Sequence, residues 1–359
     1  MVLLVSKLRR FLLFSLVLFS IGLQAQDKRF LYVSVTPGFL LSHRADIKNL
    51  ASHNTGVEVS FEQEQNNSYW GDYYSEPTIG FGLLYYNLGK ESTGNAIGGT
   101  AHIKLQVADF SGLQLNFRMA GGLAYLTKKF DLQDNRRNQA VGSHINGSMQ
   151  FGLVLLKRFE TSYIELGPSI SHYSNAAFKL PNLGYNIPSF TFRFGKELGL
   201  VKYGTQKAVA NADLISWRAT AIYGKKQLNI SDPLDFTNFG LQIRGLYQVK
   251  SVRSWRFGLD YTRDKTYGFS ENPQQDLESL SVGETSEVAV AGGFHWSFGK
   301  TDVVAELGAY VYRPYTSKSP ISQRIGIVYR FTDHLSGQGT LKFHNGVADF
   351  FEWGVGYTL

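Results

Sequence analysis

A histidine and a serine two residues apart are the residues of this chain best suited to chemistry. Residues 171–188 read SHYSNAAFKLPNLGYNIP and follow a run in which Ile164 and Leu166 alternate with polar residues. The strand period of two puts His172 and Ser174 on the same side as these apolar residues. Alternate residues of a strand lie about 7 Å apart, so a histidine ring that leans along the strand reaches the serine hydroxyl. The spacing predicts a base beside its nucleophile.

The same stretch resembles the signature of the outer-membrane lipid A 3-O-deacylase family, whose longer relatives are called acyloxyacyl hydrolases. The residues that carry the resemblance are His172, Tyr173, Ser174, Asn175 and Ala176, followed by Pro181, Asn182 and Gly184. A looser match runs from residue 121 to residue 140. The resemblance implies an outer-membrane barrel of a Gram-negative cell, with its active site on the lipid-facing wall. It implies an ester hydrolase that removes an acyl chain from lipid A of lipopolysaccharide, and it implies no metal and no cofactor.

The family also implies a role for each residue of the motif. Ser174 attacks the ester carbonyl, His172 takes its proton, and donors near Asn175 and Ala177 hold the oxyanion. The acid that orients the histidine in the family aligns on Asn186, so an amide stands where the family has a carboxylate. Ala177 stands where the family usually has a glycine.

Charged residues cluster in two connections beside this motif. Cations that could pair with the phosphates of lipid A are Lys128, Lys129, Arg136, Arg137 and Lys179. Solvated loop charge is the alternative interpretation. Asp131 and Asp134, in the first of these connections, are further candidates for the missing acid, whereas Glu165 has the parity of the opposite, lumen-facing side.

Composition narrows the class of protein. The chain has 359 residues, of which 43% are hydrophobic and 18% charged, and it contains no cysteine. This excludes a disulfide scaffold, thiolate metal sites, a cysteine nucleophile and a lipoprotein anchor. The net charge of +7 is spread over scattered lysines and arginines rather than a basic block, so we expect no nucleic-acid binding.

The first 25 residues have the pattern of a secretory signal peptide. Lys7, Arg9 and Arg10 precede an apolar run over residues 11–23, and Ala25 follows as a small residue at the expected cleavage point. The run is shorter than the roughly 20 residues that a spanning helix needs. We therefore expect cleavage, which leaves residues 26–359 as the mature protein.

The rest of the chain alternates between apolar and polar residues in segments separated by turn residues. Clear examples are residues 57–62, 102–107, 113–119, 255–262 and 351–359. A soluble β-sandwich also alternates, but the secretory signal, the glycines on the polar face and the aromatic cluster from Tyr69 to Tyr74 favour a transmembrane barrel with an aromatic girdle. We predict an all-β outer-membrane antiparallel β-barrel of about 14 to 16 strands over residues 26–359, with a lipid-facing site near residues 171–188.

The lengths of the connections give the barrel an orientation. Joins such as residues 157–162 and 298–302 are short, as periplasmic turns are, while joins such as 128–142 and 174–188 are long, as extracellular loops are. This places His172 and Ser174 at the extracellular rim. Two joins are longer than the scheme allows, at residues 64–76 and 198–213, and the second also fits a seam between two smaller barrels.

Several alternatives stay open at this point. A non-enzymatic barrel, a porin or solute channel with a degenerate hydrolase motif, is the main competing function. His344, Asp349 and Glu352 form a second polar group, but His344 and Glu352 have lumen parity, which favours an internal polar network. The sequence does not decide which acyl ester is cut, whether the lumen conducts, or whether the chain forms a homodimer.

Overall fold

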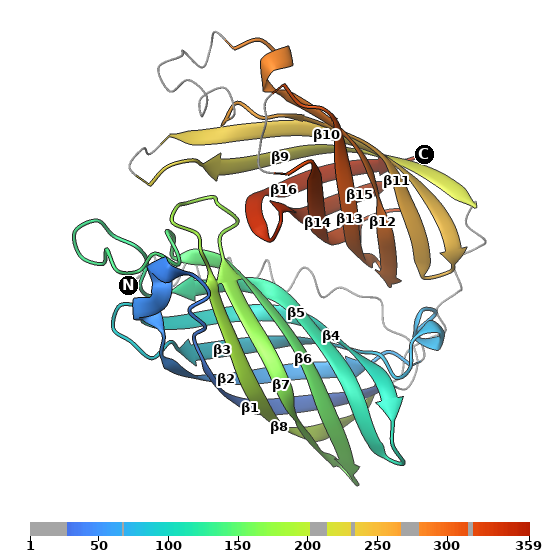
Figure 1. Cartoon of the computed structure of the whole chain (residues 1–359). Helices are drawn as coiled ribbons and strands as arrows, with labels where there is room; N and C mark the ends of the chain where they lie inside the picture. The colour runs from blue at the N-terminus through green and yellow to red at the C-terminus, as the bar shows by residue number, and fades with distance from the viewer. Residues whose placement is uncertain (1–26, 67, 202–213, 231–233, 267–279, 315–318) are drawn as a thin grey trace, which may run out of the picture.

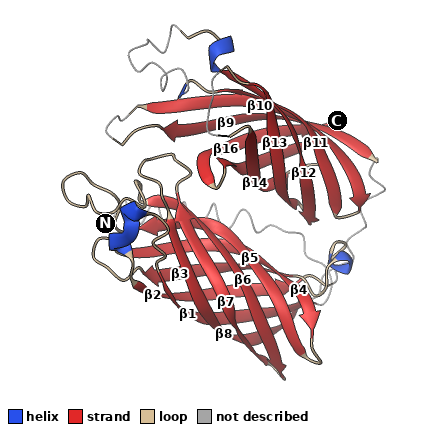
Figure 2. Ribbon diagram, in the orientation of Figure 1, coloured by secondary structure: helices blue, strands red, loops and turns tan. Residues whose placement is uncertain are grey.

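A computed structural model of the chain describes residues 27–66, 68–201, 214–230, 234–266, 280–314 and 319–359. The predicted signal peptide, residues 1–25, lies outside the described residues. Antiparallel strands dominate the described chain, and its 3-10 helices are short (Figures 1 and 2). No helix among the described residues is long and apolar enough to cross a bilayer.

The strands of the described chain form two closed barrels of eight strands each (Figure 1). The N-terminal barrel consists of β1 (Asp27–Phe39), β2 (His53–Glu64), β3 (Thr78–Asn87), β4 (Asn95–Asp109), β5 (Leu113–Leu126), β6 (Ile145–Phe159), β7 (Ser162–Ser174) and β8 (Tyr185–Val201). The C-terminal barrel consists of β9 (Ile215–Gln227), β10 (Asp235–Lys250), β11 (Arg253–Arg263), β12 (Ser286–Phe298), β13 (Thr301–Tyr312), β14 (Ile321–Arg330), β15 (Leu335–His344) and β16 (Val347–Thr358). The loops contain the 3-10 helices η1 (Ala45–Leu50), η2 (Gly71–Tyr73) and η3 (Gly283–Thr285).

The prediction of a single barrel over residues 26–359 is wrong. β8 returns to pair with β1, with Phe194 opposite Val33, and β16 pairs with β9, with Trp353 opposite Tyr223. In each set of eight, the first and last strands therefore pair with each other. None of the described strands keeps an unpaired edge that could join the two sets into one sheet. β8 ends at Val201 and β9 begins at Ile215, so the division between the two barrels falls between these residues. The seam predicted at residues 198–213 coincides with it, but residues 202–213 lie outside the described part of the chain.

Burial along the strands follows the predicted alternation. On β8, Phe192 and Phe194 point outward and are 52% and 54% exposed, while Arg193 between them is buried in the lumen. An apolar outer wall around a polar interior is the arrangement of a transmembrane barrel.

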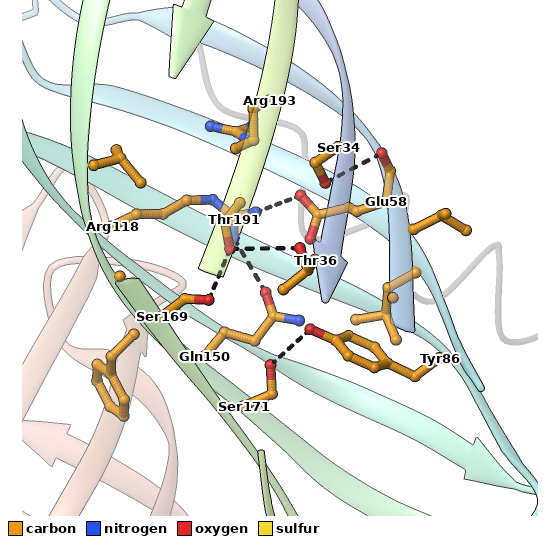
Figure 3. A pocket seen from close by; sticks show the side chains of 16 residues that line it. Ser34, Thr36, Glu58, Tyr86, Arg118, Gln150, Ser169, Ser171, Thr191 and Arg193 are labelled. Atoms are coloured by element: carbon orange, nitrogen blue, oxygen red, sulfur yellow. Dashed lines mark hydrogen bonds and ion pairs between the residues drawn. The ribbon is translucent and has the colours of Figure 1, made fainter. Parts of the chain in front are cut away.

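The lumen of the N-terminal barrel is filled by paired charges. Glu62 accepts hydrogen bonds from Lys104, at 2.8 Å, and from Arg193, and both cations also bind Glu165. Toward the loop-rich end, the lumen keeps a cavity of only about 30 Å³ among polar side chains (Figure 3). That volume holds about one or two water molecules.

The C-terminal barrel is filled in the same way by different residues. Glu306 accepts from Arg244 at 3.0 Å, from Arg256 at 2.6 Å and from Arg324 at 3.0 Å. Glu352 also binds Arg324, so this member of the second polar group belongs to the internal network, as its parity predicted.

Connection lengths separate the two ends of the N-terminal barrel. Loops 40–52, 127–144 and 175–184 lie at one end, and the turns at residues 110–112 and 160–161 lie at the other. Short periplasmic turns and longer extracellular loops are typical of outer-membrane barrels.

The loop at residues 65–77 is the exception at the short-turn end, because it contacts the C-terminal barrel. The Trp70 ring packs edge-on against Phe298, with centroids 5.7 Å apart, and the Tyr69 hydroxyl donates to the carbonyl of Gly299 at 2.9 Å. Tyr69 and Trp70, which the sequence assigned to an interfacial girdle, therefore contact the second barrel, while Tyr73 of the same cluster is exposed. Apolar side chains serve a protein contact as well as a lipid contact, and the sequence pattern is the same for both.

Candidate active site

β7 and β8 bring His172, Ser174 and Asn186 together at the loop-rich end of the N-terminal barrel. The register places His172 directly opposite Asn186. His172 Nε2 lies 2.8 Å from Ser174 Oγ, and His172 Nδ1 lies 2.7 Å from Asn186 Oδ1. Because an amide oxygen only accepts, Nδ1 carries the proton and the free lone pair of Nε2 accepts the serine hydroxyl. This is the tautomer that a general base for serine requires.

A fourth residue, His43, extends this chain of hydrogen bonds. Asn186 Nδ2 lies 3.1 Å from Nδ1 of His43, a residue in the loop that follows β1, and the same Nδ1 lies 3.3 Å from the carbonyl oxygen of Leu41. The amide of Asn186 thus directs its nitrogen to His43 and its oxygen to His172. Sequence reasoning had no signal for His43, because it lies 143 residues from Asn186.

The three residues lie on the outer wall of the barrel. Ile170 and Phe190, their neighbours on the same face, are 39% and 40% exposed, while Tyr173 on the opposite face is fully buried in the lumen. His172 and Ser174 are half-buried. The site therefore faces the membrane side at the level where the strands end.

Gly184 makes room for the histidine ring. It adopts φ +77°, an angle that glycine reaches without strain and that residues with side chains rarely adopt. A Cβ atom on it would lie 2.8 Å from Cε1 of His172. Glycine at 184 therefore serves both the turn before β8 and the close approach of His172.

The loop at residues 175–184 is held by its own asparagine. Asn175 donates from its backbone N–H to Asn182 Oδ1 at 2.8 Å, and from its side chain to Ser143 Oγ at 2.9 Å and to the carbonyl of Lys179 at 2.8 Å. The donors of Asn175 are thus engaged in structuring the loop.

Two alanines with left-handed backbone follow Asn175. Ala176 has φ 55° and Ala177 has φ 60°. The second stands where the resembling family usually has a glycine, which is the residue that best tolerates this conformation. Within the described part of the chain, the backbone N–H groups of both alanines have no hydrogen-bond acceptor, so both are available to a ligand.

The predicted phosphate-binding cations lie close to this loop. Lys128, Lys129, Arg136 and Arg137 line a depression of about 800 Å³, which His144 also lines. Lys179 is exposed on the 175–184 loop and is not part of that lining. The depression adjoins the site, because Ser143, next to His144, binds Asn175.

The two acids considered as replacements for the missing carboxylate lie elsewhere. Asp131 and Asp134 both line the basic depression. Asp131 Oδ1 accepts from the backbone N–H groups of Gln133, at 2.9 Å, and Asp134, at 3.1 Å. These donors hold the pKa of Asp131 below its ordinary value. The partner of His172 Nδ1 is Asn186.

One other histidine and serine at the same spacing, which sequence reasoning did not single out, are also hydrogen-bonded. On β12, His295 Nε2 lies 3.0 Å from Ser297 Oγ, but that hydroxyl donates to Asp302 at 2.9 Å. Both side chains are buried in the lumen of the C-terminal barrel. The apolar residues Phe294 and Trp296 alternate with this pair along the strand, and this alternation could have shown that His295 and Ser297 face the lumen.

The fold and the site define a class of protein, an antiparallel membrane-type barrel with a serine and histidine pair on its outer wall. Comparison with known families assigns both barrels. Residues 55–195 match the family Lipid A 3-O-deacylase (PagL), and residues 215–359 match the family Acyloxyacyl hydrolase, C-terminal domain. The chain belongs to the lipid A 3-O-deacylase and acyloxyacyl hydrolase family.

Solved structures give weaker similarities. The crystal structure of the outer membrane enzyme PagL is 18% identical, with a TM-score of 0.35, over 45% of this chain and 97% of that chain. A triple mutant of the Rhodopseudomonas blastica porin is 10% identical, with a TM-score of 0.19, over 93% of this chain and 99% of that chain. No curated protein matches the sequence.

Proposed function

We propose that the protein is an outer-membrane serine ester hydrolase that removes an acyl chain from lipid A of lipopolysaccharide. The observation that carries the proposal is the hydrogen-bonded series Ser174, His172 and Asn186 on the outer wall of the barrel. Family membership supports the substrate class. The serine mechanism rests on the geometry.

The reaction follows from the tautomer of His172. Ser174 Oγ attacks the ester carbonyl while Nε2 of His172 takes its proton. The tetrahedral intermediate collapses as Nε2 returns that proton to the leaving sugar alkoxide, which leaves an acyl group on Ser174. Water, deprotonated by His172, then releases the fatty acid and restores the serine.

The backbone N–H groups of Ala176 and Ala177 are our candidates for the oxyanion donors. They follow Ser174 in the chain, and they are not engaged by other described residues. Asn175 would support them indirectly, by holding the loop. Removal of one oxyanion donor typically costs about 10²- to 10³-fold in turnover.

The position on the outer wall suits a lipid substrate. Exposed Phe190 and Phe192, beside the site on β8, offer apolar surface to an acyl chain that stays in the bilayer. The ester then meets Ser174 at the membrane interface without leaving the lipid phase. The saccharide phosphates would lie above it, near the depression lined by Lys128 and Arg136 and near Lys179.

The competing function, a porin or solute channel, is less well supported. Ion pairs around Glu62 fill the lumen of the N-terminal barrel, and ion pairs around Glu306 fill the lumen of the C-terminal barrel. A porin needs a polar lumen filled with water, whereas ion pairs occupy both lumens here.

The test is hydrolysis of lipopolysaccharide by the purified protein in detergent, with released fatty acid measured by mass spectrometry. Ser174→Ala and His172→Ala should each abolish release, and the double variant should lose little more, because residues that act as a unit are non-additive. Ser297→Ala is the matched control, since it removes a serine at the same spacing from histidine but inside the lumen. Full activity in Ser174→Ala would exclude the serine mechanism.

A further inference from the structure

Gln227 of the C-terminal barrel reaches the loop beside the candidate active site. It is the last residue of β9 and is 3% exposed. Its backbone N–H donates to the carbonyl of Ala177 at 2.9 Å, and its side-chain oxygen Oε1 accepts from the N–H of Leu180 at 2.9 Å. One buried residue of the second barrel thus binds the 175–184 loop of the first at two points.

The two points lie at the end of the least favourable part of the loop and just after it. Ala176 and Ala177 both have left-handed backbone angles, which alanine rarely adopts. Such conformations persist where surrounding contacts hold them. Gln227 binds the carbonyl at the end of this turn and the N–H of Leu180 three residues later, so it opposes relaxation of the turn toward an ordinary conformation.

The turn also carries the N–H groups assigned above to the oxyanion. Their direction depends on the backbone angles of Ala176 and Ala177, because rotating a peptide plane moves its N–H. Oxyanion donors act only when they are directed at the position where charge develops. A contact that fixes this turn therefore acts on the transition state more than on the bound substrate.

Two other contacts between the barrels do not involve the 175–184 loop. The hydroxyl of Tyr69 binds the carbonyl of Gly299 at 2.9 Å, and the hydroxyl of Tyr73 binds Ser251 at 2.8 Å. Both lie at the short-turn end of the barrels, away from Ser174. They join the barrels without touching the 175–184 loop.

From these contacts we infer that Gln227 is a positioning residue, through which the C-terminal barrel holds the oxyanion turn at Ala176 and Ala177. The inference rests on the proposed function and extends it, because it gives the second barrel a part in catalysis by the first. The chemistry stays with Ser174 and His172.

The experiment uses the full chain and compares three variants with the wild type. Gln227→Met keeps the length of the side chain and removes the acceptor of Leu180 N–H, so we expect kcat for fatty acid release to fall about tenfold with KM unchanged. Gln227→Glu restores an acceptor and should recover most of that loss. Tyr69→Phe removes a hydrogen bond between the barrels at the other end and should keep wild-type kcat and KM.

Two kinetic results would overturn the inference. One is wild-type kcat in Gln227→Met. The other is an equal loss in Gln227→Met and Tyr69→Phe, which would mean that contact between the barrels matters only in general.

A second measurement does not depend on hydrolysis. Hydrogen exchange over residues 175–184 should accelerate in Gln227→Met, because the Leu180 amide loses its acceptor, and should stay unchanged in Tyr69→Phe. If the wild type releases no fatty acid, the proposed function fails, and accelerated exchange still supports the contact as the element that holds the turn. Unchanged exchange in Gln227→Met overturns it.

Discussion

Replacement of Asn186 by aspartate tests whether the amide limits the reaction. The substitution keeps the shape of the side chain, and the 2.7 Å distance from His172 Nδ1 to Asn186 Oδ1 already suits a carboxylate oxygen. Glutamate, the longer acid, would have to displace the ring from this position. Asn186→Asp should therefore raise the rate by placing a negative charge beside the imidazolium that forms as Ser174 loses its proton.

The size of the effect follows from two opposing free energies. Opposite charges about 4 Å apart attract by about 4 kcal/mol at an effective dielectric constant near 20. The amide already supplies a hydrogen bond worth about 1 kcal/mol, which leaves about 3 kcal/mol. At about 1.4 kcal/mol for each tenfold change, we expect kcat to rise about 10²-fold. The comparable Asp to Asn change in trypsin, a serine protease with a Ser-His-Asp triad, costs about 10⁴-fold in turnover and sets the upper limit.

The assay is single-turnover release of fatty acid from lipopolysaccharide, measured both in the chain with Ser174 and in the Ser174→Ala background. The gain must disappear in the Ser174→Ala background, and Asn186→Ala should lie below the wild type. The substitution also constrains His43, which lies beside the amide of Asn186. A carboxylate only accepts hydrogen bonds, so Nδ1 of His43 must carry a proton and donate to it. Equal rates in wild type, Asn186→Asp and Asn186→Ala would refute the claim that residue 186 orients His172.

Two further substitutions test the surroundings of the site. Gly184→Ala should reduce the rate at least about tenfold, because the added Cβ would lie 2.8 Å from Cε1 of His172 and because φ +77° strains alanine at the turn before β8. Fatty acid release at wild-type speed would show that the ring has room to move. Arg193→Met removes one of the two cations that Glu62 and Glu165 share in the lumen, leaving Lys104 to serve both, and breaking a buried pair in this way typically costs about 3 to 5 kcal/mol. The temperature at which the barrel unfolds, followed by the change in gel migration between unheated and heated samples, should fall, and an unchanged temperature would contradict the importance of that network.

The strands and their faces could be predicted from the sequence because alternation is a local property. Each residue of a strand points opposite to its neighbours, so the exposed apolar residues Phe192 and Phe194 identify the lipid side without knowledge of any partner strand. Closure could not be predicted in this way. The pairing of Val33 with Phe194 joins residues far apart in the chain, and a strand that closes a barrel of eight carries the same alternation as one that continues into a larger barrel.

For the candidate site, too, some features follow from the sequence alone and others from the tertiary structure. The sequence by itself determined that His172 and Ser174 share the outer face near a strand end, because their spacing and the period of a strand fix it. It also determined that an amide stands at position 186. Only the tertiary structure showed that His43, from another loop, lies against the same amide. It alone decided that Gln227 of a second barrel binds the loop beside Ser174, because contacts between separately closed barrels leave no periodic pattern in the sequence.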